Sequence, residues 1–307
     1  MATGIVSVAA WLQGLPVLSN VLLAIAVLGW FAVAAVACGR ALRTASGRPR
    51  LGSFAFVAAT GVLGAHFSVA GHNLVALTLW ALASAAWVVL LARRPQLTRP
   101  DGSWLLVVVG TESLAALASL LAPYLGAELL PVALAWWALG LALYPPVAAV
   151  IAVRLRSRPR FGPNLWITMG ALAIATLAGT ELLEAARSLQ TLAALRAGLR
   201  DVDIATWAMA SAWIPPLLAA EARNPAGWHY SSSRWSFVFP LGMYGVATQM
   251  LGRAAKLGPL ADLAHAFFAA ALLAWALTLV GLTRLAIAEA HLSEKRREGL
   301  RGLSRRF

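Results

Sequence analysis

Two ionisable side chains that could do chemistry fall inside long apolar stretches of this 307-residue chain. Glu112 stands near the middle of one stretch, where an ionised side chain costs about 2.5 to 3.5 kcal/mol on insertion scales. His66 follows Thr60 and Gly61 in another stretch, and a histidine changes charge near physiological pH. Each residue could bind and release a proton. Glu112 could equally be a buried carboxyl kept neutral by a partner such as Thr111 or a backbone carbonyl, and for His66 we favour buried packing.

Signatures of bond-making chemistry are missing from the sequence. We find no Walker loop, no zinc-protease motif, no serine-hydrolase elbow and no histidine cluster with the spacing of metal ligands. The single cysteine, Cys38, can form neither a disulfide framework nor a cysteine metal site. We therefore expect no enzymatic activity, no metal and no cofactor. Any transport should be passive or driven by an ion gradient, because no nucleotide-binding segment is present.

The elements that position Glu112 and His66 are expected to be membrane-spanning helices. Hydrophobic residues make up 60% of the chain and charged residues 12%, against about 45–50% and about 25% in soluble domains. Apolar windows of about twenty residues have the length of a helix that crosses a bilayer. We predict an all-α integral membrane protein, a single transmembrane domain over 1–307. The ten predicted spans are 1–13, 18–42, 51–70, 73–93, 103–122, 128–153, 163–185, 204–221, 234–252 and 264–289.

Basic residues follow every second predicted span. Five of the 25 Lys and Arg lie in the loops of one side, and the other 20 lie on the opposite side. The positive-inside rule places the basic loops and both termini in the cytoplasm, in a multi-pass protein of the inner membrane. Five helical hairpins result, at 1–42, 51–93, 103–153, 163–221 and 234–289. The basic tail at 291–307 is expected against anionic lipid, and we set aside a nucleic-acid partner for the net charge of +13.

The first helices of the five hairpins share a glycine, which suggests an internal repeat. Small residues let helices approach closely or expose backbone to a cavity, whereas plain apolar helices face lipid. We expect the odd-numbered spans to form an inner ring around a central pore; close packing without a pore is the alternative. The predicted pore-lining residues are Thr3, Gly4, Thr60, Gly61, Gly110, Thr111, Glu112, Gly170 and Gly242.

Two motifs resemble a known family. The segment from Trp235 to Gly242, WSFVFPLG, and the opening from Met1 to Ser7, MATGIVS, are similar to motifs of the tellurite-resistance and C4-dicarboxylate transporter family. That family includes the plant slow anion channels and the yeast sulfite exporters. The resemblance implies five hairpins in a quasi-fivefold ring around a pore, and a homotrimer in which each protomer has its own pore. One departure is that the chain begins inside the first motif, so the first span is short.

The resemblance also implies a gate, a phenylalanine of the ninth helix that plugs the pore. The matching residue is Phe239, with Phe237 as the alternative, and Pro240 is expected to kink the gate helix and free a carbonyl. A bulky apolar ring in a narrow lumen excludes hydrated ions by dewetting. The expected cargo is a small anion: chloride or nitrate, sulfite, a tellurite-like oxyanion or a C4-dicarboxylate. The alternative function is a proton-coupled secondary transporter that uses Glu112 or His66.

Overall fold

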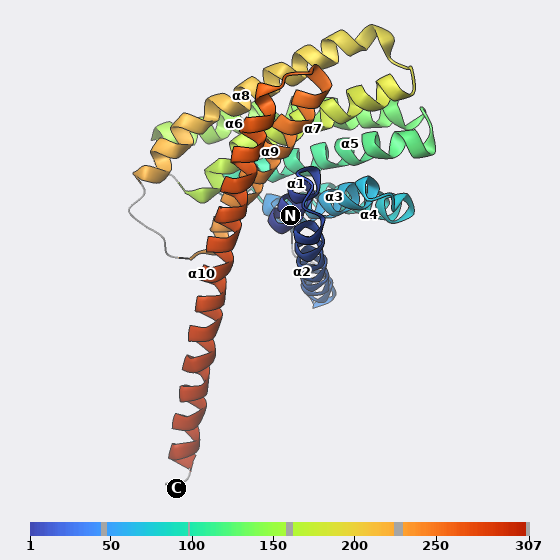
Figure 1. The fold of residues 1–307 in the computed structure, drawn as a ribbon. Coiled ribbons are helices and arrows are strands. Elements are labelled where there is room, and N and C mark those ends of the chain that lie inside the picture. Colours follow the sequence, from blue (N-terminus) through green and yellow to red (C-terminus); the bar gives the residue numbers. More distant parts are fainter. Residues whose placement is uncertain (44–47, 98, 158–161, 224–229, 305–307) are drawn as a thin grey trace.

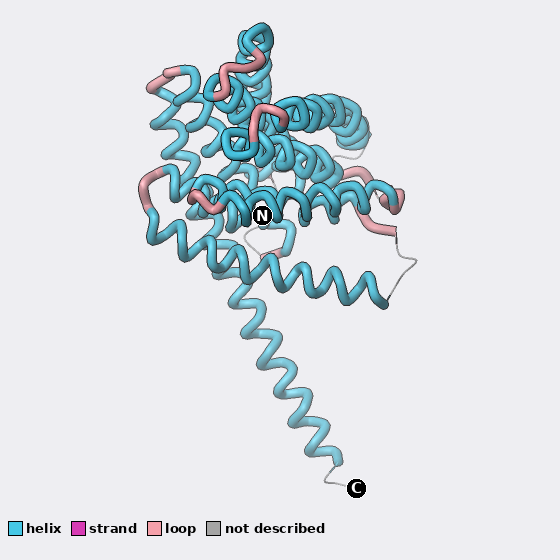
Figure 2. The backbone as a smooth tube through the Cα atoms, turned by 90° about the vertical axis from the view of Figure 1, so that its right-hand side faces the viewer, coloured by secondary structure: helices cyan, strands magenta, loops and turns pink. Residues whose placement is uncertain are grey.

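The fold is all-helical in the part of the chain that the structure describes. This computed structural model describes residues 1–43, 48–97, 99–157, 162–223 and 230–304, and within these ranges it contains ten α-helices and no strand. Figure 2 draws the described loops between the helices in pink. The predicted fold class is confirmed. The helices are α1 (Ala2–Leu12), α2 (Pro16–Arg43), α3 (Phe54–Val69), α4 (Asn73–Ala92), α5 (Leu106–Leu125), α6 (Leu129–Ser157), α7 (Ile167–Ser188), α8 (Arg196–Ala222), α9 (Trp235–Ala255) and α10 (Pro259–Ser304).

A short 3-10 helix directly precedes α3, α5, α7 and α9. These turns are η1 (Leu51–Ser53), η2 (Gly102–Leu105), η3 (Pro163–Trp166) and η5 (Ser232–Arg234), and a further one, η4 (Ala193–Leu195), precedes α8. A tightened first turn at the same place in four hairpins is a structural counterpart of the repeated glycines. It supports the interpretation that the hairpins are copies of one unit.

Two helices extend eight residues or more beyond their predicted bounds. α8 begins at Arg196, eight residues before the predicted start at 204, so the charged stretch around Asp201 and Asp203 is helical. α10 continues to Ser304 and includes most of the tail predicted at 291–307, whose last residues, 305–307, lie outside the described ranges. Figure 1 shows the C-terminal part of α10 projecting past the other helices.

The odd-numbered and even-numbered helices differ in burial. In the apolar windows of α5 and α7, 94% and 89% of the residues are buried, and α3 is intermediate with 50%. In the even-numbered helices the share is between 6% and 22%. Side chains of α2 such as Leu28 and Phe31 are largely exposed, as lipid-facing residues would be. The predicted division into inner odd helices and outer even helices is confirmed.

Within the described residues, eight helices are long and apolar enough to cross a membrane. The other two in the described ranges are inner helices. α1 has only eleven residues, in agreement with the short first span expected from the sequence. α9 has twenty-one residues, but it carries Thr248 and Gln249 along with the aromatic Tyr244.

The inner helices pack against one another in chain order. α1 contacts α3, α3 contacts α5, α5 contacts α7, α7 contacts α9, and α9 contacts α1. Glycines lie at these contacts: a Cβ built at Gly170 of α7 would lie 2.9 Å from Cγ of Pro240 in α9. A Cβ at Gly242 would lie 3.0 Å from Cγ2 of Ile5 in α1. The glycines allow close approach of neighbouring helices, the use that small residues commonly have in membranes.

In each even helix, one tryptophan donates a hydrogen bond of 3.0 Å or less to the odd helix of the next hairpin. We call these bonds the tryptophan links. Each indole N–H donates over 2.8–3.0 Å, and the pairs are Trp30–Thr60, Trp87–Thr111, Trp137–Ala175, Trp207–Thr248 and Trp275–Thr3. The acceptor is a threonine hydroxyl in four links and the carbonyl oxygen of Ala175 in the fifth. The last link joins α10 to α1, so every hairpin is tied to its successor and the fifth to the first.

Candidate functional site

The basic loops lie together at one end of the bundle. The N–H of Gln96 donates to the Pro49 carbonyl over 2.7 Å, and Nε of Arg48 donates to the Arg94 carbonyl over 2.7 Å. These bonds join the loops before α3 and before α5. Nδ2 of Asn164 donates to Oδ2 of Asp101 over 3.1 Å, which brings in the loop before α7. We call this the basic end; Arg158 and Arg160 of the same predicted cluster lie outside the described residues.

The two gate candidates occupy different environments. Phe239 is fully buried in the core formed by the inner helices. Phe237 is only half-buried, and its ring packs edge-to-face on Trp166 of η3 with 4.4 Å between ring centroids. Pro240 packs on Gly170, and α9 continues through it as one helix. Proline lacks an N–H, so the carbonyl of Ser236 has no helical donor at that position.

The threonines predicted to line a pore turn their hydroxyls toward the outer helices. Thr3, Thr60 and Thr111 each accept a tryptophan link. The hydroxyls of Thr60 and Thr111 also donate to the carbonyls four residues earlier in their own helices, those of Phe56 and Val107. These hydroxyls therefore stabilise contacts between hairpins, and a pore-lining role for their residues stays a prediction.

The predicted glycines of the inner helices are all buried, and each faces a neighbouring helix. Gly4 faces Val62 of α3, with 3.1 Å from a built Cβ to Cγ1, and Gly61 faces Ser113 of α5 at 2.7 Å. Gly110 faces Val57 of α3 at 3.4 Å. Their place in the lining of a passage likewise stays a prediction.

His66 belongs to a buried polar cluster at α1, α2 and α3, which we call the serine–histidine cluster. Nδ1 of His66 lies 3.2 Å from Oγ of Ser7. Ser7 donates to the carbonyl of Ser19 over 2.8 Å, and Ser19 donates back to the carbonyl of Ser7 over 2.8 Å. The indole of Trp11 lies edge-on to the imidazole, 6.1 Å between centroids. This is the arrangement of a histidine satisfied by its packing.

Glu112 has a different environment. Its side chain is fully buried, and neither carboxyl oxygen has a hydrogen-bond partner. The expectation that Thr111 or a backbone carbonyl satisfies it is wrong, because the Thr111 hydroxyl is engaged by Val107 and Trp87. The carboxyl instead faces Gly140 of α6, where a Cβ would lie 2.3 Å from Oε1.

Sequence reasoning missed Asp203, a second fully buried carboxyl in the bundle. Asp203 lies on α8 and faces Gly179 of α7. It was overlooked because the predicted span began one residue later, at 204. The useful signal was the helical extension of α8, in which Asp203 falls four residues before the apolar face at Trp207.

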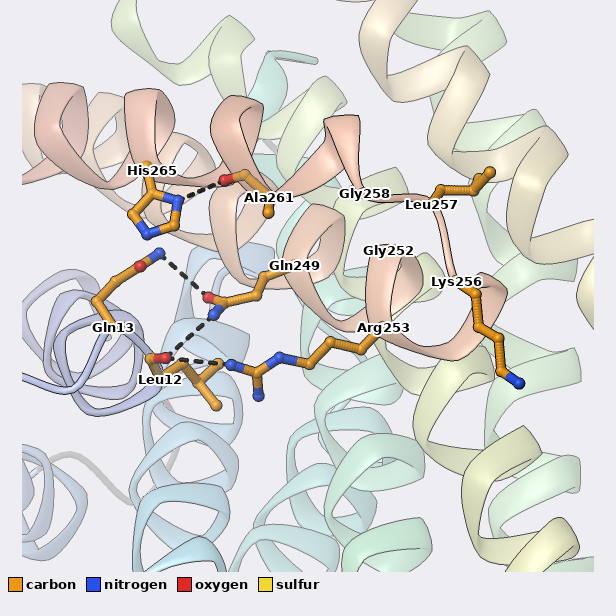
Figure 3. Close-up of a pocket in the computed structure, with 10 residues that line it drawn as sticks. All are labelled: Leu12, Gln13, Gln249, Gly252, Arg253, Lys256, Leu257, Gly258, Ala261 and His265. Atoms are coloured by element: carbon orange, nitrogen blue, oxygen red, sulfur yellow. Dashed lines mark hydrogen bonds between the residues drawn. The ribbon is translucent and has the colours of Figure 1, made fainter.

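A polar pocket opens at the end opposite the basic end. It has a volume of about 520 Å³, and Figure 3 draws the ten residues that line it, which come from the ends of α1 and α9 and the start of α10. Gln13 donates to Gln249 over 3.2 Å, and Gln249 donates to the Leu12 carbonyl over 3.1 Å. Arg253 donates to the same carbonyl over 3.2 Å, while Lys256 also borders the pocket. The pocket therefore offers two cations and two amides to an entering molecule.

Comparison with known proteins decides the family. The sequence profile of the voltage-dependent anion channel family matches residues 1–283. The chain belongs to this family. Members of this family are anion channels or transporters. The chain is accordingly a multi-pass membrane protein, and the family membership confirms the resemblance drawn from the two motifs.

Among curated proteins, the chain is similar to an uncharacterized membrane protein of Mycobacterium tuberculosis, found in two strains. The identity is 35% over 151 residues, which cover 46% of this chain and 75% of the relative. The relative is described by its membrane location alone.

Proposed function

We propose that the five odd helices enclose a passage for small anions in each protomer and that Phe239 closes it. The family match over residues 1–283 carries this proposal. The burial of Phe239 among the inner helices supports its role, because an apolar ring in a narrow lumen excludes hydrated ions. Its packing on Trp166 makes Phe237 the weaker candidate.

Charge at the two ends favours anions over cations in this proposal. The basic end would face the cytoplasm of the inner membrane, with both termini on that side. At the other end, Arg253 and Lys256 border the polar pocket. A positive mouth raises the local anion concentration by electrostatic focusing. Selection would rest on size and charge, which accommodates chloride, nitrate, sulfite, tellurite-like oxyanions and C4-dicarboxylates, and each protomer of a homotrimer would conduct independently.

The test is anion flux through purified protein in liposomes. We expect Phe239→Ala to raise chloride and nitrate conductance at least several-fold, and Phe239→Leu to give an intermediate value. Phe237→Ala is the matched control, and its conductance should remain near the wild-type level. Thermal melting must accompany the flux, since truncating a buried phenylalanine costs about 3–5 kcal/mol. Unchanged conductance in a folded Phe239→Ala protein would contradict the gate.

A second candidate function, proton-coupled transport, is favoured by the unpartnered carboxyl of Glu112. Glu112 is the better proton site of the two predicted ones, because Nδ1 of His66 is already engaged by Ser7. Reversal potentials separate the two functions. A passive channel reverses at the Nernst potential of the anion at every pH, whereas proton coupling shifts that potential when a pH gradient is imposed.

A further inference from the structure

Two buried carboxyl groups lie in neighbouring hairpins, each facing the other helix of its own hairpin. Glu112 lies on α5, and neither of its oxygens has a hydrogen-bond partner. Asp203 lies on α8, where Oδ1 has no partner and Oδ2 accepts one long bond of 3.4 Å from Thr180. Both side chains are fully buried. A buried polar group without partners costs free energy, so its presence calls for an explanation.

A glycine on the partner helix makes room for each carboxyl. A Cβ at Gly140 would lie 2.3 Å from Oε1 of Glu112, and a Cβ at Gly179 would lie 1.9 Å from Oδ1 of Asp203. Contacts this short exclude any larger residue at either position while the carboxyls stay in place. Glycine in a helix costs about 0.5–1 kcal/mol relative to alanine. The bundle thus accommodates both acids at a cost in helix stability.

Trp137 lies near both glycines. It lies on α6 one turn before Gly140, and its atom Cε2 would be 3.0 Å from a Cβ at Gly179. Its indole N–H donates to the carbonyl of Ala175, which makes it the tryptophan link without a threonine. Helix α7 contacts α5, α6 and α8, so both carboxyls lie within one group of packed helices. Helices α5, α6, α7 and α8 therefore meet around one acidic pair.

No cation of the described residues neutralises the acidic pair. None of the ion pairs in the described ranges includes Glu112 or Asp203. Several other titratable groups lie on the helices packed against them within those ranges, and most are engaged elsewhere. The engaged groups are His66, bonded to Ser7; Tyr144, bonded to the Thr168 carbonyl; Glu184, paired with Arg187; Arg196, bonded to the Ala186 and Thr191 carbonyls; Asp201, paired with Arg200; Glu221, paired with Arg234; Tyr244, bonded to Ser211; and Arg253, bonded to the Leu12 carbonyl. The remaining groups are Tyr124 near the end of α5, Arg154 and Arg156 in the last turn of α6, and Glu181 on α7, next to Thr180. α4 has none.

We propose that Glu112 and Asp203 form a proton-binding site between the third and fourth hairpins. A proton fits because it needs no coordination shell, whereas a metal ion needs several further oxygen ligands. The described residues contain no group of three side chains that could hold a metal ion. When both acids carry protons, the hairpins pack without charge. Loss of both protons places two negative charges in a low-dielectric interior, where they repel each other and lose the solvation of water.

Infrared spectroscopy of the purified protein tests the site without any transport. We expect a carbonyl stretch of protonated carboxylic acid at neutral pH, and we expect Glu112→Gln and Asp203→Asn each to remove one component of that band. Asp201→Asn is the matched control, since Asp201 lies two residues away on α8 with its side chain 68% exposed. Absence of the band at neutral pH, or a band that survives both substitutions, overturns the proposal. If the band is absent and sodium stabilises the wild-type protein, the acidic pair binds a metal ion and the proposal is overturned.

A second measurement tests whether the site regulates the passage, and this part rests on the proposed anion function. Chloride flux through wild-type protein in liposomes should fall several-fold as pH rises through the range in which the infrared band disappears. Flux through Glu112→Gln and Asp203→Asn should lose that pH dependence, while Asp201→Asn keeps it. A pH dependence unchanged in both variants overturns the regulatory role. Failure of flux in every protein, with the band intact, would count against the anion function and leave the proton site standing.

Discussion

Two buried polar clusters in this protein differ in how many of their side-chain polar atoms have hydrogen-bond partners. In the serine–histidine cluster, the hydroxyls of Ser7 and Ser19 both donate hydrogen bonds, and His66 is engaged through Nδ1. In the acidic pair, three of the four carboxyl oxygens lack any partner. Buried polar groups are normally hydrogen-bonded because an unmet group costs about 1–3 kcal/mol. The hydrogen bonds of the first cluster indicate a structural role. The unpartnered oxygens of the second are what we expect of a site that binds a proton.

The largest expected loss of stability comes from filling the space beside Asp203, at Gly179. Gly179→Ala would place a methyl group 1.9 Å from Oδ1, and we expect a loss of about 3 kcal/mol in stability from overpacking. Removing the carboxyl as well, in Gly179→Ala with Asp203→Ala, should recover most of that loss. Gly29→Ala is the control, because nothing lies within 4 Å of that position. Thermal unfolding in detergent measures all three, and equal effects of the two glycine substitutions would contradict the crowding.

Breaking the satisfied cluster should have the next largest effect. Ser7→Ala removes the donor to the Ser19 carbonyl and the partner of His66, so we expect a loss of about 2 kcal/mol. Val8→Ala controls for general loss of packing in α1. A neutral Ser7→Ala would mean that the cluster contributes nothing to stability, and it would weaken the contrast with the acidic pair.

The acidic pair should respond in the opposite direction. Replacing an unpartnered buried carboxyl by an apolar group of similar shape is neutral or stabilising, so Glu112→Met should leave the melting temperature unchanged or raise it. The measurement is made at neutral and at alkaline pH, and the gain over wild type should be larger at alkaline pH. A strong destabilisation by Glu112→Met would indicate that the carboxyl supports the fold.

The smallest effect is expected from a tryptophan link. Hydrogen bonds between membrane helices contribute about 0.6 kcal/mol on average, so Trp87→Phe should cost little beyond its lost packing. A double-mutant cycle with Thr111→Val isolates the bond between them. A coupling energy near zero would show that this hydrogen bond does not contribute to the stability of the bundle.

The helices were predictable because apolar stretches of spanning length leave few alternatives in lipid. The division into inner and outer helices also followed from composition, since each odd helix carries a glycine at a similar place in its span whereas the even helices are plainer apolar stretches. α8 was the weakest element, because its first turns carry charged residues and resemble a loop. That error of eight residues hid Asp203.

Partners across the bundle could not be read from one sequence. The repeat drew attention to Gly61 and Gly170, yet nothing in it indicated that Ser113 and Pro240 would fill the space beside them. Likewise, Thr60 and Thr111 looked like polar groups for a lumen, whereas indoles of the outer helices take their hydroxyls. The direction in which each side chain points around its helix axis depends on the packing of all five hairpins at once. Short periodic patterns do not contain that information.

The tryptophan link from α10 to α1 makes the fifth junction equivalent to the other four. The order in which the chain connects the hairpins could then be changed without losing any contact between them. A gene permuted to begin at α3 and to join α10 to α1 through a linker should preserve every indole bond. Such a rearranged polypeptide would assemble the same bundle from a different starting hairpin.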